Sequence, residues 1–218
     1  MKIISNFYDG KFIKSESADK LSLYKPTTGE EYAHIPITTD KEFQSIIDKM
    51  KIAQASWANT PITKRSSILF KFKNLIEKNF DDIARIISVE HGKVFSDAKG
   101  SLQRGLEVVD FACGIPHLLK GNHSINVGTN VDSFDIKQPL GLCAGITPFN
   151  FPAMVPMWMF PISIACGNAF MLKPSEKVPQ CSLKLGELLN EAGLPENVLT
   201  IVNGDKSVVD KILQSSDI

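Results

Sequence analysis

Two short segments carry the side chains that could do chemistry in this chain. Residues 145–152 place the neutral amide of Asn150 on a turn framed by Pro148 and Pro152, after an apolar strand. Residues 173–177 follow the next apolar run and offer an ammonium and a carboxylate. An amide can donate to a developing oxyanion, and a carboxylate with an ammonium can hold the hydroxyls of a ribose. Together the segments indicate a nucleotide site beside a site that stabilises negative charge.

Each segment also fits a structural role. Asn150, directly before Phe151 and Pro152, is a good helix cap, and both roles are compatible because a helix N-terminus favours negative charge. A turn carrying Lys173 and Glu176 also fits a solvated loop after a strand. If that turn binds a nucleotide, the Glu176 carboxylate would repel a 2′-phosphate, which favours NAD over NADP.

The elements that must position these segments alternate between strand and helix. Apolar runs predict strands at 142–146, 169–172 and 198–202. Helical spacing predicts a helix after each strand, at 151–166, 180–191 and 207–213. This alternation predicts a parallel sheet with right-handed crossovers, and ligands bind beyond the carboxyl ends of such strands. Both segments follow strands there. Because the Gly-x-Gly-x-x-Gly fingerprint is missing, a cofactor must be held in another way.

Extended segments occur outside this alternating region. Residues 6–14 and 21–37 read as a short hairpin and strands at a sheet edge, with a turn at 27–30. Residues 123–137 alternate apolar and polar side chains, which is typical of an extended hairpin. Because this second hairpin would lie outside a doubly wound core, we expect it to be an oligomerisation arm.

Helices fill the segment between the two hairpins. Apolar side chains recur at helical spacing from Thr39, with Asp40 as the expected cap. A second helix starts after Pro61, Gly92 ends a third, and a fourth runs over about 96–113. These helices precede the alternating region and are expected to support it.

Composition excludes several classes of function. The chain has 24 basic and 24 acidic residues, so it has no electrostatic footprint for nucleic acid or an anionic membrane. No charged residue occurs from Gln138 to Leu172, but five prolines and three glycines interrupt that run. A buried strand, helix and strand therefore fit this run better than a membrane span.

The cysteines and histidines give no catalytic or metal pattern. The four cysteines are scattered without metal-type or redox-pair spacing, so a reducing cytoplasm is expected and no metal site is predicted. Those in apolar elements should have a raised pKa, which disfavours a nucleophilic thiolate. His91, near a helix end, is expected to interact with the helix dipole rather than to act as a base. The cysteines are Cys113, Cys143, Cys166 and Cys181.

The run from Pro139 to Pro179 resembles the coenzyme region of the aldehyde dehydrogenase superfamily. The segments 149–152, 154–156 and 158–161 are similar to its methylmalonate-semialdehyde branch. The resemblance covers essentially the whole chain and implies an α/β fold. The implied unit is a partial N-terminal NAD-binding domain over 1–218, with a parallel Rossmann-type sheet and no catalytic domain. Its implied parts are N-terminal helices at about 39–118, an oligomerisation β-hairpin at about 123–138 and a βαβαβ unit at about 140–218.

The resemblance also implies roles for individual residues. It places Thr147 and Phe149 beside the coenzyme, and Asn150 as the oxyanion donor. Lys173 and Glu176 are implied to hold the adenosine ribose, with Lys177 nearby, where many members of the branch carry arginine.

Arg104 matches a position that binds the substrate carboxylate in that branch. A guanidinium can grip a carboxylate through two hydrogen bonds, as an acidic semialdehyde requires. The sequence alone favours an ordinary surface arginine on a helix.

The activity implied for the complete enzyme is NAD-dependent oxidation of methylmalonate or malonate semialdehyde with CoA, giving propionyl-CoA or acetyl-CoA and CO2. The resemblance also implies valine or inositol breakdown in the cytoplasm and a homo-oligomer, a dimer or tetramer. Because no cysteine has the glycine-flanked setting of the family nucleophile, the chain alone is expected to be inactive. Two alternatives stay open: a relative that hydrolyses its thioester and acts on another semialdehyde, and a non-catalytic, truncated module for NAD binding or oligomerisation.

Overall fold

The structure, a computed structural model, describes residues 2–218. Its central sheet has the strand order β3-β2-β10-β9-β8. These strands are β2 (Asn6–Tyr8), β3 (Lys11–Ile13), β8 (Leu142–Ile146), β9 (Ala169–Lys173) and β10 (Leu199–Ile201). Strands β8, β9 and β10 are parallel, as predicted, whereas β2 pairs antiparallel with β10. The sheet is therefore mixed, because the N-terminal hairpin extends its edge.

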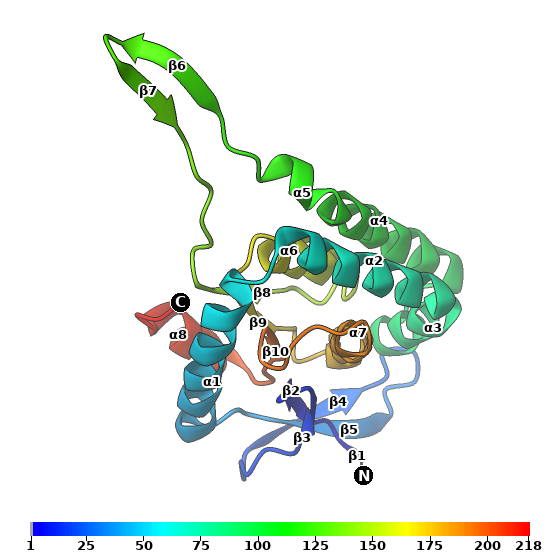
Figure 1. The fold of residues 1–218 in the computed structure, drawn as a ribbon. Helices are drawn as coiled ribbons and strands as arrows, with labels where there is room; N and C mark the ends of the chain where they lie inside the picture. Colours follow the sequence, from blue (N-terminus) through cyan, green and yellow to red (C-terminus); the bar gives the residue numbers. More distant parts are fainter. Residues whose placement is uncertain (1) are drawn as a thin grey trace.

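Helices cover both faces of the central sheet (Figure 1). On one face lie α1 (Asp40–Ala58) and α8 (Lys206–Gln214), and on the other lie α6 (Met154–Ala165) and α7 (Pro179–Glu191). Successive residues of β9 point to opposite faces, so Met171 packs with the α1 side and Leu172 with the α6 and α7 side. This burial on both faces explains why β9 is apolar throughout until Lys173.

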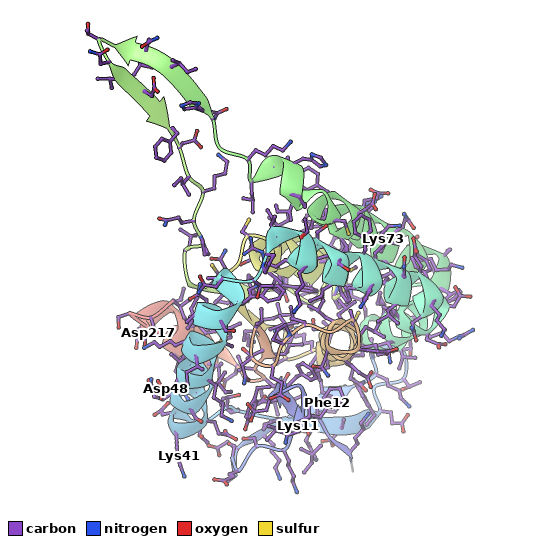
Figure 2. The ribbon with its side chains drawn as sticks, viewed as in Figure 1. Lys11, Phe12, Lys41, Asp48, Lys73 and Asp217 are labelled. Carbon is purple, nitrogen blue, oxygen red and sulfur yellow. The ribbon has the colours of Figure 1, made fainter. Side chains whose placement is uncertain are left out.

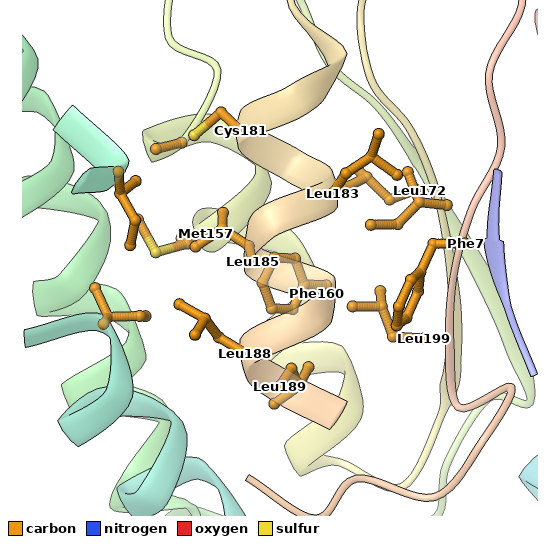
Figure 3. Close-up of a cluster of buried hydrophobic side chains, with 14 of the residues drawn as sticks. Phe7, Met157, Phe160, Leu172, Cys181, Leu183, Leu185, Leu188, Leu189 and Leu199 are labelled. Atoms are coloured by element: carbon orange, nitrogen blue, oxygen red, sulfur yellow. The ribbon is translucent and has the colours of Figure 1, made fainter. Parts of the chain in front are cut away.

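The cluster between α7 and the sheet fixes the carboxyl end of β9. Figure 3 shows Leu183 of α7 beside Leu172, near Leu199 and Phe7 of the sheet, with Phe160 of α6 in the same cluster. All five side chains are buried. Burying one such side chain contributes about 1.5–3 kcal/mol. The strand end that carries Lys173 is therefore held by a well-packed core.

A third layer of helices lies outside α6 and α7 (Figure 1). It contains α2 (Ile62–Lys78), α3 (Phe80–His91), α4 (Phe95–Cys113) and the short α5 (Ile115–Leu118). Helix α4 packs closely on α6, where a methyl group at Gly105 would lie 3.2 Å from the Met154 Cα. Helix α3 ends at Gly92, whose φ of 82° is left-handed, as the sequence predicts.

Two predicted helix starts are wrong. The cap of α1 is Thr39 rather than Asp40, because the Thr39 hydroxyl and the Glu42 carboxylate form a reciprocal capping box. Helix α6 starts at Met154, not at residue 151. Its N-cap is Ala153, which gives no side-chain cap. Asn150 lies before this start and is not the cap of α6.

A second sheet lies at the N-terminal end of the chain, with the order β1-β5-β4. Its strands are β1 (Lys2–Ile3), β4 (Lys20–Tyr24) and β5 (Glu31–Pro36). The predicted hairpin is present as the antiparallel pair β4 and β5. The parallel pairing of β1 with β5 is not predicted, because two residues show no periodicity.

The predicted second hairpin consists of β6 (His123–Gly128) and β7 (Val131–Phe134). It projects from the body of the molecule, and its side chains stand apart from the other elements (Figures 1 and 2). Every residue of both strands is exposed. The uncharged run after it divides into β8, α6 and β9, as predicted. No helix within residues 2–218 has the length and apolar content that crossing a bilayer requires.

Candidate coenzyme and oxyanion site

The two predicted segments meet at the carboxyl edge of the sheet. Ile146 of β8 is in register with Lys173 of β9, and the Thr147 amide donates to the Lys173 carbonyl over 3.1 Å. Thr147 is buried. Parallel pairing thus places the turn at 147–151 (the Asn150 turn) beside the turn at 173–177 (the Lys173 turn).

The Lys173 turn is built around an ion pair between a buried lysine and a partly exposed glutamate. Lys173 Nζ lies 3.1 Å from a Glu176 carboxylate oxygen, and Lys173 is only 3% exposed. Partial burial opposes ionisation of Glu176, but its own main-chain amide and Lys173 lower its pKa. Within residues 2–218, Glu176 is the one acceptor bonded to Lys173 Nζ. An ammonium has three donors, so this buried group has capacity for a ligand hydroxyl.

Phe149 carries contacts between the two turns and α3. Lys177 Nζ lies 4.8 Å from the centre of the Phe149 ring, a favourable cation–π distance. The His91 ring stacks on Phe149 with centroids 6.4 Å apart. Phe149 remains 49% exposed, so its ring is available to a ligand.

His91 lies in the last turn of α3, as predicted, but not as a charged partner of the helix dipole. Burial and the nearby Lys93 lower the pKa of its imidazole. The ring is therefore neutral at pH 7 and contributes no charge there.

Asn150 is exposed, and its side-chain amide has no hydrogen-bond partner within the described part of the chain. Its main-chain carbonyl accepts a hydrogen bond from Lys93 Nζ over 3.0 Å. The same ammonium lies 4.5 Å from the centre of the Phe151 ring. The Asn150 side-chain amide is thus open to a reacting group. The backbone that carries it is held by Lys93, from outside the turn.

Arg104 is exposed on α4 and forms no ion pair among residues 2–218. Its neighbour Gly105 contacts Met154, the first residue of α6. Arg104 therefore lies on the helix that packs against the start of α6. That start follows Asn150 closely in the chain.

Sequence reasoning missed Glu90 as part of this region. Glu90 is buried and accepts from the main-chain amides of Gln180, over 3.0 Å, and Cys181, over 3.3 Å. Burial raises the pKa of Glu90 to about 7, although these bonds and one from Tyr32 oppose the rise. Glu90 therefore caps α7, the helix that follows the Lys173 turn. The only signal in the sequence is Val178, the residue before α7. Its side chain cannot accept a hydrogen bond, so the cap of α7 must come from elsewhere in the chain.

A cleft of about 610 Å³ adjoins both turns. One wall is formed by β4 and Pro26, and the other by the end of α3 and the two turns. Phe149, Glu176 and Lys177 of the predicted site line it together with His91. A ligand bound at the turns would have room to extend here.

Three of the four cysteines are poorly suited to act as nucleophiles. Burial, with a contribution from Asp110, raises the pKa of Cys113 to about 11. Burial also raises the pKa of Cys166 and Cys181. No group of three or more acidic, histidine or cysteine side chains within residues 2–218 could hold a metal ion.

Comparison with known proteins decides the family. The model of the aldehyde dehydrogenase family matches residues 12–218. This chain belongs to the aldehyde dehydrogenase family. A malonate-semialdehyde dehydrogenase of Pseudomonas aeruginosa is 46% identical over the whole chain, which covers 44% of that protein. The acylating mitochondrial methylmalonate-semialdehyde dehydrogenase of Arabidopsis thaliana is 46% identical over 99% of the chain and 35% of its own length.

Solved structures of the family have the same fold. The methylmalonate-semialdehyde dehydrogenase of Oceanimonas doudoroffii superposes with a TM-score of 0.97 at 46% identity. The match covers the whole of this chain and 44% of the length of that protein. A structure from Sinorhizobium meliloti in complex with NAD gives the same TM-score at 45% identity and the same coverage. The chain thus spans less than half the length of these relatives.

Proposed function

We propose that this chain provides the NAD-binding and oxyanion-stabilising parts of a CoA-acylating dehydrogenase of methylmalonate or malonate semialdehyde. One observation carries the proposal: the ion pair of the buried Lys173 with the partly exposed Glu176 lies beside the Asn150 turn at the carboxyl edge of the sheet. The likeness to semialdehyde dehydrogenases over the whole chain supports the substrate class.

The residues present fit NAD. Lys173 Nζ is buried with spare donors, and the ionised Glu176 carboxylate accepts, so together they would hold the two hydroxyls of the adenosine ribose. Glu176 would repel the 2′-phosphate of NADP. Phe149, Thr147 and Lys177 would line the coenzyme path. NAD, when bound, supplies the acceptor for a hydride from the aldehyde carbon.

Asn150 and Arg104 are assigned to the semialdehyde. When a thiolate adds to the aldehyde, the Asn150 amide would donate to the oxyanion, with no reorganisation of solvent. Arg104 would bind the substrate carboxylate through its guanidinium. Burial raises the pKa of Cys113, Cys166 and Cys181, and Cys143 lies at the amino end of β8, away from the carboxyl edge of the sheet. We therefore propose that the thiolate comes from outside residues 1–218.

The remaining assignments concern the complete enzyme. CoA would take the acyl group, with loss of CO2, in a cytoplasmic homo-oligomer. The exposed apolar side chains of the β6–β7 hairpin support oligomerisation, because such side chains gain by burial against a partner. They include Ile125, Val127, Val131 and Phe134.

Product analysis tests this proposal. The complete enzyme that contains this chain is incubated with methylmalonate semialdehyde and NAD, with and without CoA. Formation of propionyl-CoA and CO2 is expected, whereas release of a free acid in the presence of CoA would favour the hydrolytic alternative. The purified 218-residue chain should bind NAD and form no NADH. NADH formation by the chain alone would contradict the assignment of the thiolate.

A further inference from the structure

The loop between α3 and α4 touches the Asn150 turn through a residue that the proposed function does not use. Lys93 Nζ donates to the Asn150 carbonyl over 3.0 Å and lies 4.5 Å from the centre of the Phe151 ring. We propose that Lys93 is a positioning residue that fixes the direction of the Asn150 amide. This inference rests on the proposed role of Asn150 as oxyanion donor.

The Asn150 turn needs such support. It begins at the end of β8, and the next regular element, α6, starts only at Met154 without a side-chain cap. Phe149 and Asn150 are exposed, so the core does not hold them. The peptide group between Asn150 and Phe151 includes the carbonyl that Lys93 binds. Holding that carbonyl holds the peptide plane that contains the Asn150 Cα, and so restrains the backbone from which the Asn150 side chain projects.

Lys93 is itself well placed to act as a support. The left-handed Gly92 turns the chain out of α3, and a methyl group there would lie 2.9 Å from Pro26. Three residues before Lys93, the buried Glu90 binds the start of α7. The lysine therefore projects from a backbone that is anchored on two sides.

A double-mutant cycle in the complete enzyme tests the inference. The variants are Lys93→Met, Lys93→Arg, Asn150→Ala and the double Lys93→Met/Asn150→Ala. Lys93→Met keeps an apolar stem against Phe151 but removes the ammonium. The matched control is Lys99→Met, which removes an ammonium that lies near the Phe80 and Phe95 rings, on residues outside the site.

We expect Lys93→Met to lower kcat about tenfold, the factor of one hydrogen bond to a charged group, with the KM for NAD unchanged. Lys93→Arg should restore most of the loss, and Lys99→Met should leave kcat unchanged. Because Lys93 acts through Asn150, Lys93→Met should cause no further loss in the Asn150→Ala background. Melting temperatures of the Lys93→Met and Lys99→Met variants should agree.

Two results would overturn the inference in different ways. If Asn150→Ala lowers kcat but the two losses multiply, or Lys93→Met has no effect, Lys93 does not act through Asn150 and the proposed function stands. If Asn150→Ala itself leaves kcat unchanged, the oxyanion assignment fails, and the role of Lys93 fails with it.

Discussion

The Lys173 turn and the Asn150 turn lie side by side, yet they are held in opposite ways. Lys173 ends a strand that is buried along its whole length, and its ammonium is paired inside the protein. Asn150 is exposed and precedes a helix that lacks a side-chain cap. Its backbone is bound by Lys93, a residue 57 positions earlier in the chain.

This difference would separate the two proposed functions at one edge of the sheet. In the proposed function, the coenzyme-binding Lys173 is held by core packing, so changes there should affect NAD affinity first. The proposed oxyanion donor, Asn150, is held by a contact from Lys93 in the loop after α3, so its position can change without loss of the core. The two neighbouring turns thus combine a rigidly held group, Lys173, with a hydrogen-bond donor, Asn150, whose position depends on residues outside the sheet.

The largest expected effect comes from Asn150→Asp in the complete enzyme. The substitution keeps the shape but replaces a donor by a carboxylate, so kcat should fall by about 10²–10³-fold or more. The NAD dissociation constant should stay the same, because the Lys173 turn is untouched. Steady-state kinetics and NAD titration measure the two quantities. Asn74→Asp, on the exposed face of α2, is the control; a loss of NAD affinity in Asn150→Asp would break the separation between the turns.

The connection between α3 and α7 predicts a pH-dependent stability. The folded-state pKa of Glu90 is about 7, above its usual value of 4.5. The stability that this group contributes is therefore fully present below about pH 4.5 and is lost as the pH rises through 7. The loss should be on the order of 3 kcal/mol. Glu90→Gln should flatten this slope in denaturant unfolding across that range.

The matched control for Glu90→Gln is Glu187→Gln. Glu187 is also a glutamate, but it is exposed on the outer side of α7, so its substitution leaves the buried contacts intact. It should keep the wild-type slope. An unchanged slope in Glu90→Gln would show that another group dominates the pH dependence and that the α3–α7 contact carries little of it.

A smaller effect is expected from Lys173→Met. Removing one charged donor from a ribose should weaken NAD binding by about 1.5–3 kcal/mol, while kcat at saturating NAD is kept. Lys184→Met is a close control, because Lys184 and Glu187 form an ion pair with the same three-residue spacing in an exposed setting. Calorimetric titration compares the variants. Equal NAD affinity in both would remove the ribose role from the Lys173 turn.

The sequence predicts the Lys173 turn better than the support of the Asn150 turn. The apolar runs of β8 and β9 and the helix between them imply parallel pairing, and this places Thr147 beside Lys173. The contacts of Lys93 with Asn150 and of Glu90 with Gln180 join residues 57 and 90 positions apart, so no local pattern encodes them. They depend on how α3 and the loop after it pack against α7 and the Asn150 turn.

Local errors have local causes. Thr39 and Asp40 are both good cap residues, and the capping box with Glu42 decides between them. The apolar pattern predicts too early a start for α6, because residues 151–153 are as apolar as the helix that follows. No local pattern predicts the mixed sheet, because the pairing of β2 with β10 joins opposite ends of the chain.

The most direct test of the account is a crystal structure of the complete enzyme with NAD bound. The account predicts the adenosine ribose hydroxyls within hydrogen-bonding distance of Lys173 Nζ and the Glu176 carboxylate, with the nicotinamide end directed toward the side of the Asn150 amide. A ribose bound elsewhere, with the Lys173–Glu176 pair intact and without contact to NAD, would contradict it.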